Sequence, residues 1–280
     1  RGLGDVYKRQ TLVGLLASLF LLGLLLMFSA QHPALLLDPA SLGIVLGGTF
    51  AATCISYPMA EIRRIPALLA TVLRRERDPA PAMIDELVGL ARRWNDGDSR
   101  GVENALAEVR NPFLGSGVQL LVDQVAEEDI LELLQWRMTR LRAKEQAEAQ
   151  LFRAMAGYAP AFGMLGTLVG MVNLVFVLGD GDIASVGRQM ALSLTTTLYG
   201  LLLANLVCRP IAVKLERRTE RRVVLMNMIL QGISMMARKR SPGLMRETLK
   251  CFVAHYHDEL QGEQLRRAGK PLLAVWRRRA

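Results

Sequence analysis

The chain has 280 residues, of which 51% are hydrophobic and 22% are charged, and its formal net charge is +9. Mean hydropathy is positive at +0.23, and charged and apolar residues are strongly segregated along the chain, which indicates a membrane protein. We expect no nucleic-acid partner, because a membrane topology accounts for the basic surplus. No nucleophile–base or metal-ligand constellation indicates an enzyme, and the cysteines Cys54, Cys208 and Cys251 form no disulfide or zinc pattern.

Four apolar runs of about 20 residues are long enough to cross a bilayer. They cover residues 11–30, 42–60, 154–178 and 189–213. The segment between the second and third runs is helical in pattern. The predicted fold is therefore all-α, a polytopic inner-membrane protein with four transmembrane helices and a helical cytoplasmic domain between spans two and three.

Arginine and lysine set the predicted orientation. Residues 31–41 contain none, and residues 179–188 contain only Arg188. Residues 61–153 contain 14, and residues 209–280 contain 17. Both termini and the long central segment are therefore expected in the cytoplasm of a bacterial cell, with two short loops outside.

The predicted organisation has five segments. They are a non-native or truncated leader (1–10), a transmembrane hairpin (11–60), a cytoplasmic helical domain (61–153), a second transmembrane hairpin (154–213) and a cytoplasmic helix with a basic tail (214–280).

Two long helices are expected to leave the membrane without a break. The helical pattern that starts at Ala126 meets no interruption before the third run. The fourth run continues past Pro210 into residues 214–239. One side of that continuation is apolar and suited to contact with another helix; it carries Val224, Met228, Ile229 and Met236. The tail after Pro242 is expected to be loosely ordered.

Small and hydroxyl residues concentrate in APAFGMLGTLVG (159–170) and SLTTTLYGLLLA (193–204). Thr167 and Thr197 are expected at similar depth, roughly 12–16 Å from the turn between the two runs and close to mid-bilayer. The pattern is compatible with close helix packing or with a polar path, and spacing alone favours packing. The residues that share a helical face are Gly163, Thr167 and Gly170 in the first run, and Ser193, Thr197, Gly200 and Ala204 in the second.

Three further residues are candidates for function. Asp38 before Pro39 is a predicted helix N-cap at the external mouth of the second run, where a carboxylate could also attract cations. Pro160 and Pro210 are expected to bend their helices at one level, where membrane and cytoplasmic parts meet. No run contains an ionisable residue inside the membrane, so ion conduction would need a carboxylate from another chain.

Several motifs in the right order resemble the MotA/PomA subunit of the bacterial flagellar motor stator. These motifs are LLLDPASLGIVLGG, NPFLGSGVQLLVD, APAFGMLGTLVGMV, LTTTLYGLLLANLV, RPIAVKLERR and SPGLMRETL, and they cover most of residues 11–252. The resemblance implies a homo-oligomer, a pentamer, around a dimer of a single-span MotB/PomB-type partner that supplies the ion-binding aspartate. It also implies transport of H⁺ or Na⁺, no cofactor, and torque on a FliG-type rotor switch protein.

The resemblance assigns roles to individual residues. It implies an ion path at Thr167, Thr196 and Thr197, conformational coupling at Pro160 and Pro210, and an external mouth at Asp38.

In the cytoplasmic segment the resemblance places the torque-generating glutamate at Glu103. The family's basic partner lies eight residues earlier, where this chain has Asn95, and among the flanking arginines we favour Arg93. Gly157 stands where some sodium-type members carry an acid, so the coupling ion stays open.

The sequence distinguishes a stator subunit from two other kinds of membrane protein. The ExbB/TolQ type of energising subunit shares the core helices but has one span before its cytoplasmic segment, whereas a two-span hairpin is predicted here. A secondary transporter would show inverted repeats, broken helices and its own charged site, and none is visible. A passive membrane scaffold is the remaining alternative.

Overall fold

The computed structural model describes residue 20 and residues 38–73, 79–109, 111–179 and 183–267. The predicted leader and all of the first apolar run (residues 11–30) except residue 20 lie outside this described part. Every element in the described residues is helical, which confirms the all-α prediction. Among the described residues, three helices are long and apolar enough to cross a membrane; they contain the third and fourth predicted runs and most of the second.

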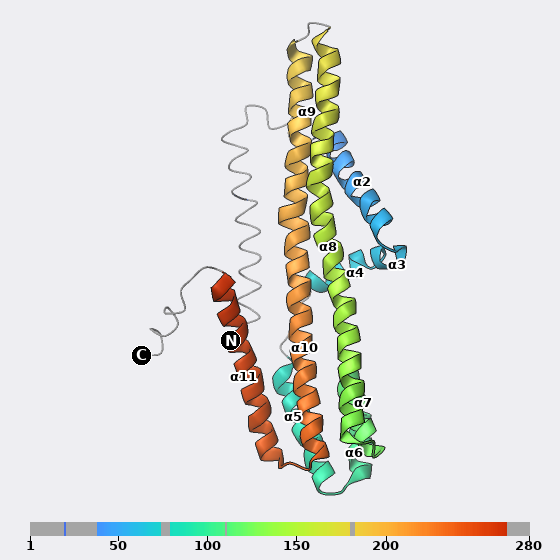
Figure 1. Ribbon diagram of the computed structural model, residues 1–280, viewed down its shortest axis with the longest axis vertical. Helices are drawn as coiled ribbons and strands as arrows, with labels where there is room; N and C mark the ends of the chain where they lie inside the picture. The colour runs from blue at the N-terminus through green and yellow to red at the C-terminus, as the bar shows by residue number, and fades with distance from the viewer. Residues whose placement is uncertain (1–19, 21–37, 74–78, 110, 180–182, 268–280) are drawn as a thin grey trace, which may run out of the picture. The chain divides into compact units, whose positions relative to one another are not determined.

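The helices alternate between long membrane-type segments and shorter ones (Figure 1). In chain order they are α2 (Pro39–Ser56), α3 (Met59–Ile62), α4 (Ile65–Leu73), α5 (Ala80–Asn95), α6 (Ser99–Leu106), α7 (Pro112–Val122), α8 (Glu127–Leu178), α9 (Ile183–Leu202), the π-helix η2 (Leu203–Cys208), α10 (Arg209–Ala237) and α11 (Pro242–Arg267).

The chain forms two compact units, each made of two separate stretches. Unit 1 combines Arg1–Arg77 with Lys144–Arg218, and unit 2 combines Asp78–Ala143 with Thr219–Ala280. Helices α8 and α10 contribute residues to both units. We describe each unit by itself.

Local sequence explains where the helices begin. Asp38 accepts a hydrogen bond from the Ser41 amide and Pro39 occupies the first turn, so α2 starts where the sequence predicted a cap. Asp98 and Asn111 cap α6 and α7 in the same way. Extended backbone at Tyr57 and Pro58 ends α2.

The two predicted continuous helices are confirmed. Helix α8 runs for 52 residues with Pro160 in its interior. Helices α9 and α10 are joined through η2, where the Arg209 amide donates to the Ala204 carbonyl, five residues back. This wider turn directly precedes Pro210, which has no amide hydrogen to continue the regular pattern.

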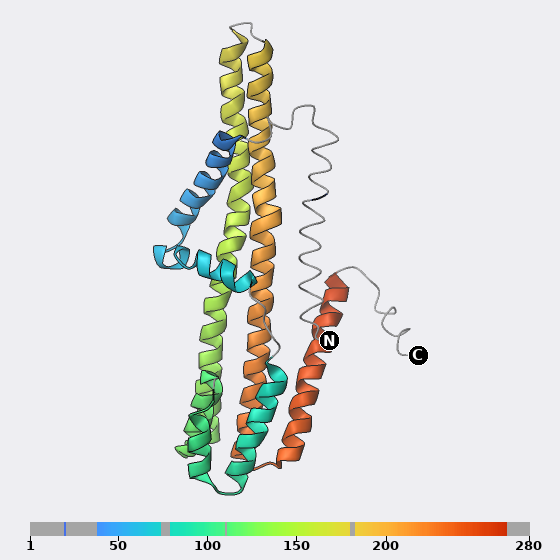
Figure 2. The same cartoon turned by 180° about the vertical axis from the view of Figure 1, so that it is seen from behind.

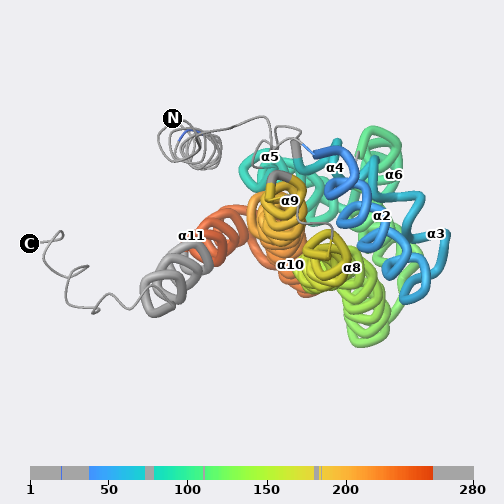
Figure 3. Tube along the Cα trace, turned by 90° about the horizontal axis from the view of Figure 1, so that it is seen from above, coloured from blue at the N-terminus to red at the C-terminus, as the bar shows by residue number. Residues whose placement is uncertain are grey.

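In unit 1, α2 lies alongside the hairpin of α8 and α9 (Figures 2 and 3). Phe162 of α8 fills the space above Gly48, where a Cβ atom would collide with the ring. The Ser56 and Tyr158 hydroxyls are 2.9 Å apart and join the C-terminal end of α2 to α8. A small apolar cluster of α4, α8 and α10 includes Leu68 and Phe152.

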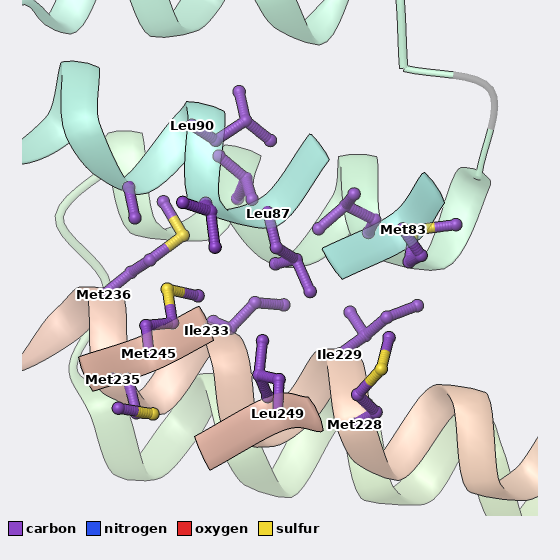
Figure 4. Packing of buried hydrophobic residues seen from close by; sticks show 14 of the residues in the cluster. Met83, Leu87, Leu90, Met228, Ile229, Ile233, Met235, Met236, Met245 and Leu249 are labelled. Atoms are coloured by element: carbon purple, nitrogen blue, oxygen red, sulfur yellow. The ribbon is translucent and has the colours of Figure 1, made fainter. Parts of the chain in front are cut away.

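The core of unit 2 is one apolar cluster from six helices, α5, α6, α7, α8, α10 and α11 (Figure 4). The predicted apolar face of α10 is confirmed, because its four members are at most 7% exposed: Val224, Met228, Ile229 and Met236. The expectation of a loosely ordered tail is wrong for the first part of that segment. Helix α11 packs on α5 and buries Met245 and Leu249, whose spacing of four places both on one face.

Ion pairs hold the ends of the unit 2 helices together. Glu127 at the start of α8 accepts hydrogen bonds from Arg238 Nε at 2.9 Å and from the Ser234 hydroxyl at 2.7 Å. Arg246 of α11 pairs with Asp85 of α5 at 2.9 Å. These contacts close the helix ends around the apolar core.

Candidate functional site

Glycines bring α8 and α9 into close contact. A Cβ atom on Gly163 would lie 3.0 Å from the Thr196 carbonyl oxygen, and one on Gly200 would lie 2.6 Å from the Ala159 carbonyl oxygen. Gly166 and Gly170 leave the same kind of space for side chains of α9. The glycine face therefore joins two helices of the same chain.

Three threonine hydroxyls gather at this contact. The Thr167 and Thr197 hydroxyl oxygens are 2.5 Å apart, and both hydroxyls also lie within hydrogen-bond distance of the Gly163 carbonyl, at 3.1 and 3.2 Å. Thr196 donates to the same carbonyl at 3.1 Å and to the Ser193 carbonyl at 2.7 Å. The structure thus brings together all three predicted ion-path residues, and confirms that Thr167 and Thr197 lie at one level.

Burial divides the three threonines into two kinds. Thr196 is only 3% exposed and bonds to backbone on both helices, so it acts as a packing group. Thr167 and Thr197 are only partly buried. Each hydroxyl has one proton and two lone pairs, so the two hydroxyls that bond to each other keep lone pairs for a cation, a water or a carboxylic acid.

The hydroxyl cluster lies beside the N-terminal end of α2. The Asp38 amide donates to the Tyr199 hydroxyl at 3.2 Å, and the Ser41 hydroxyl donates to the Leu192 carbonyl at 3.4 Å. Helix α8 continues for 11 residues from Thr167 to Leu178, or about 16 Å. The start of α2 therefore contacts α9 near the threonines rather than at the tip of the hairpin.

The environment of Asp38 favours its charged form. The hydrogen bond from Ser41 is the main cause that holds the pKa of this carboxyl below its ordinary value of 3.8, while partial burial opposes it. Asp38 therefore stays ionised in neutral solution and serves as helix cap and negative charge at once.

The two prolines do not lie at one level, contrary to our expectation. Gly200 of α9 packs against Ala159 and Pro160. Pro210 is ten residues further along from Gly200, which corresponds to about 15 Å of helix. Pro160 is thus part of the glycine contact, whereas Pro210 follows η2.

In unit 2, the predicted torque residues lie on two successive helices. A short turn joins these helices, since α5 ends at Asn95, Gly97 has a left-handed φ of +77° and α6 begins at Ser99. Arg93 Nη1 donates to the Gly101 carbonyl at 3.0 Å, which holds the guanidinium beside the first turn of α6. Glu103 is exposed one turn further on.

Two contacts of the site were missed by sequence reasoning. Tyr199 and Ser41 join α9 to the start of α2, and their only sequence signal was a polar residue in an apolar run. Within the described ranges, no three His, Cys, Asp or Glu side chains gather to hold a metal ion.

Substituting Gly200 by alanine should separate α8 from α9, because the new methyl group meets backbone that cannot move aside. We expect a loss of roughly 1–3 kcal/mol in stability, measured as a lower thermal unfolding midpoint in detergent. Gly157→Ala is the matched control, since its Cβ would meet nothing within 4 Å. Equal midpoints for the two variants would contradict the close contact.

Two substitutions of Asp38 should distinguish the contribution of its helix cap to stability from the contribution of its charge. Asp38→Asn keeps a capping side chain and should leave stability near neutral pH almost unchanged, whereas Asp38→Ala should cost about 1 kcal/mol. Because the folded pKa is depressed, the charge contributes stability above the ordinary pKa and loses it as the pH falls through the folded value. Unfolding midpoints from pH 7 to pH 3 should therefore fall more for the unchanged protein than for Asp38→Asn.

Comparison with known proteins agrees with this geometry. Residues 105–228 match the model of the MotA/TolQ/ExbB proton channel family. Protein YtxD of Bacillus subtilis is 31% identical over 82% of this chain and 84% of its own length. Motility protein A of Borreliella burgdorferi is 31% identical over 77% and 82% of the two chains.

A chain of the solved flagellar MotAB stator complex from Bacillus subtilis has the same fold, with a TM-score of 0.78 at 22% identity over 85% of this chain and 93% of that one. The relatives with known names are motility proteins, as the resemblance implied. The chain therefore belongs to the MotA/TolQ/ExbB proton channel family.

Proposed function

We propose that this chain couples ion flow along the Thr167–Thr197 hydroxyl pair to rotation of a flagellar motor. The relatives among motility proteins confirm the prediction of a flagellar stator subunit rather than an enzyme, and the solved stator complex shares the fold. The observation that carries the ion path is the pair of partly exposed hydroxyls at the contact of two membrane-type helices.

A second chain must complete the path. Residues 154–178 and 189–208 contain no Asp, Glu, His, Lys or Arg, so a proton or cation crossing there would find hydroxyl and carbonyl oxygens but no charged side chain. A MotB/PomB-type single-span partner would supply the missing aspartate. The fold shared with a MotAB complex supports such a partner and an oligomer. A pentamer around a partner dimer is the arrangement we propose.

The hydroxyl pair suits transient contact with that carboxylate. Each hydroxyl can donate either to the other hydroxyl or to the Gly163 carbonyl. Rotation about the C–O bond of Thr167 or Thr197 switches between these acceptors without backbone motion. A hydroxyl released from its partner can donate to a carboxylate or offer oxygen to a partly dehydrated cation. Either H⁺ or Na⁺ fits this chemistry.

The membrane topology completes the proposal. With residues 11–30 as the first span, the chain would cross the bacterial inner membrane four times and keep both termini in the cytoplasm. Pro160 would transmit motion, because it sits at the glycine contact near the hydroxyls. Pro210 would act separately, where η2 leads into α10.

Charged residues of α5 and α6 would act on the rotor. Glu103 is exposed, and Arg93 is held close by through its bond to Gly101. We propose that this surface contacts a FliG-type rotor switch protein electrostatically.

Thr197→Val should assemble normally but conduct and rotate poorly. The change keeps shape but removes the hydroxyl, and one hydrogen bond to a charged group is worth roughly 1.5–3 kcal/mol, or about ten- to a hundredfold in occupancy. The measurement is motor speed against external Na⁺ at fixed pH, then against pH at fixed Na⁺.

Thr195→Val is the matched control, because the Thr195 hydroxyl bonds only to the Ala191 carbonyl of its own helix. We expect Thr195→Val to keep nearly full speed and Thr167→Val to lose less speed than Thr197→Val. Full speed of Thr197→Val under every ion condition would leave the hydroxyls as packing groups.

Glu103→Lys should slow rotation while membrane insertion and partner binding stay intact, since an exposed charge contributes little to stability. Glu108→Lys makes the same charge change at another exposed position of unit 2 and should rotate normally. Torque measured on tethered cells decides the matter, and equal torque for both variants would remove Glu103 from the mechanism.

A further inference from the structure

A second turn lies beside the α5–α6 turn at one end of unit 2. Asn95 Nδ2 of α5 donates to the Arg240 carbonyl at 2.9 Å and so ties the α5–α6 turn to the α10–α11 turn. Both turns lie at the same end of unit 2 in Figures 1 and 2. We define the turn surface as residues 96–98 and 238–241 with the exposed side chains of Arg92, Arg93, Arg100 and Glu103.

The backbone of the α10–α11 turn presents two basic side chains together. Lys239 adopts a left-handed φ of 48°, and the amides of Lys239 and Arg240 donate to carbonyls of the last turn of α10. This closure ends the helix and fixes the direction in which the chain leaves it. Lys239 and Arg240 are both exposed.

These two charges have no counter-charge within the described part of the chain. The neighbouring Arg238 is neutralised by Glu127 at 2.9 Å, but no ion pair of the described residues involves Lys239 or Arg240. The turn surface holds six basic side chains, Arg92, Arg93, Arg100, Arg238, Lys239 and Arg240, against three acidic ones, Asp96, Asp98 and Glu103. Asp98 is already engaged as the cap of α6.

We propose that Lys239 and Arg240 extend the rotor-facing surface and bind an acidic face of the rotor protein. The inference rests on the proposed function, and it assigns part of the contact to a turn about 140 residues away from Glu103 in sequence. The structural reason is the Asn95 bond, which fixes the two turns side by side. Clustered like charges attract an acidic surface and raise the rate of encounter, more strongly at low salt.

The experiment reverses both charges in the complete complex. A motile bacterium without its own stator expresses this chain with its MotB-type partner, and the test variant carries Lys239→Glu and Arg240→Glu. The matched control carries Arg137→Glu and Arg142→Glu, which make the same charge change at exposed positions of α8 in unit 2. Torque of tethered cells and binding of the purified complex to the FliG-type rotor protein of that host are measured.

We expect the test variant to bind the rotor protein about tenfold more weakly at 50 mM salt and less than threefold more weakly at 300 mM, because exposed ion pairs are weak and screened. Its torque should fall, whereas the control should match the unchanged protein in both measurements. Reversing acidic residues on the rotor protein should restore binding of the test variant.

The outcomes separate this proposal from the proposed function. If the unchanged chain drives rotation and the test variant does so equally well, the turn is not part of the contact, but the stator function stands. If both variants lose binding equally, the effect is one of overall charge, and the assignment to this turn is wrong. An unchanged chain that neither rotates the motor nor binds the rotor protein would overturn both proposals.

Discussion

The close approach of α8 and α9 is the constraint on which the rest of unit 1 depends. Gly163 and Gly200 let one backbone touch the other, and a Cβ at either position would meet backbone atoms. Only at this separation can the hydroxyls of Thr167 and Thr197 reach each other and a shared carbonyl. In lipid there is no water to satisfy these groups, so close contact and polar satisfaction stabilise each other.

Helix α2 is attached to the α8–α9 hairpin at both of its ends. Its capped N-terminal end, with Asp38, is held by Tyr199 next to the threonines, while its other end is held by Tyr158. A negative charge therefore stands near the hydroxyl pair, and the hairpin of α8 and α9 continues past it.

Unit 2 is stabilised by different interactions from those that hold α8 and α9 together. Its core is a cluster of mainly Leu, Ile, Val and Met side chains that six helices exclude from water, and ion pairs such as Arg246–Asp85 close its edges. The exposed charges on its turns add little to stability and are free to contact a partner. A rigid core with charged turns is a suitable arrangement for transmitting force to another protein.

The sequence by itself determined the helical class, three of the membrane-type helices, the cap at Asp38 and the face of α10, because these follow from local periodicity and capping chemistry. It also indicated that Thr167 and Thr197 share a level. Only the tertiary structure decided that the glycines pack within one chain, that Pro160 and Pro210 lie at different levels, that α11 completes the unit 2 core, and that Asn95 holds Arg240. Each of these depends on contacts between residues far apart in the chain, and neither helical spacing nor composition records which helix meets which.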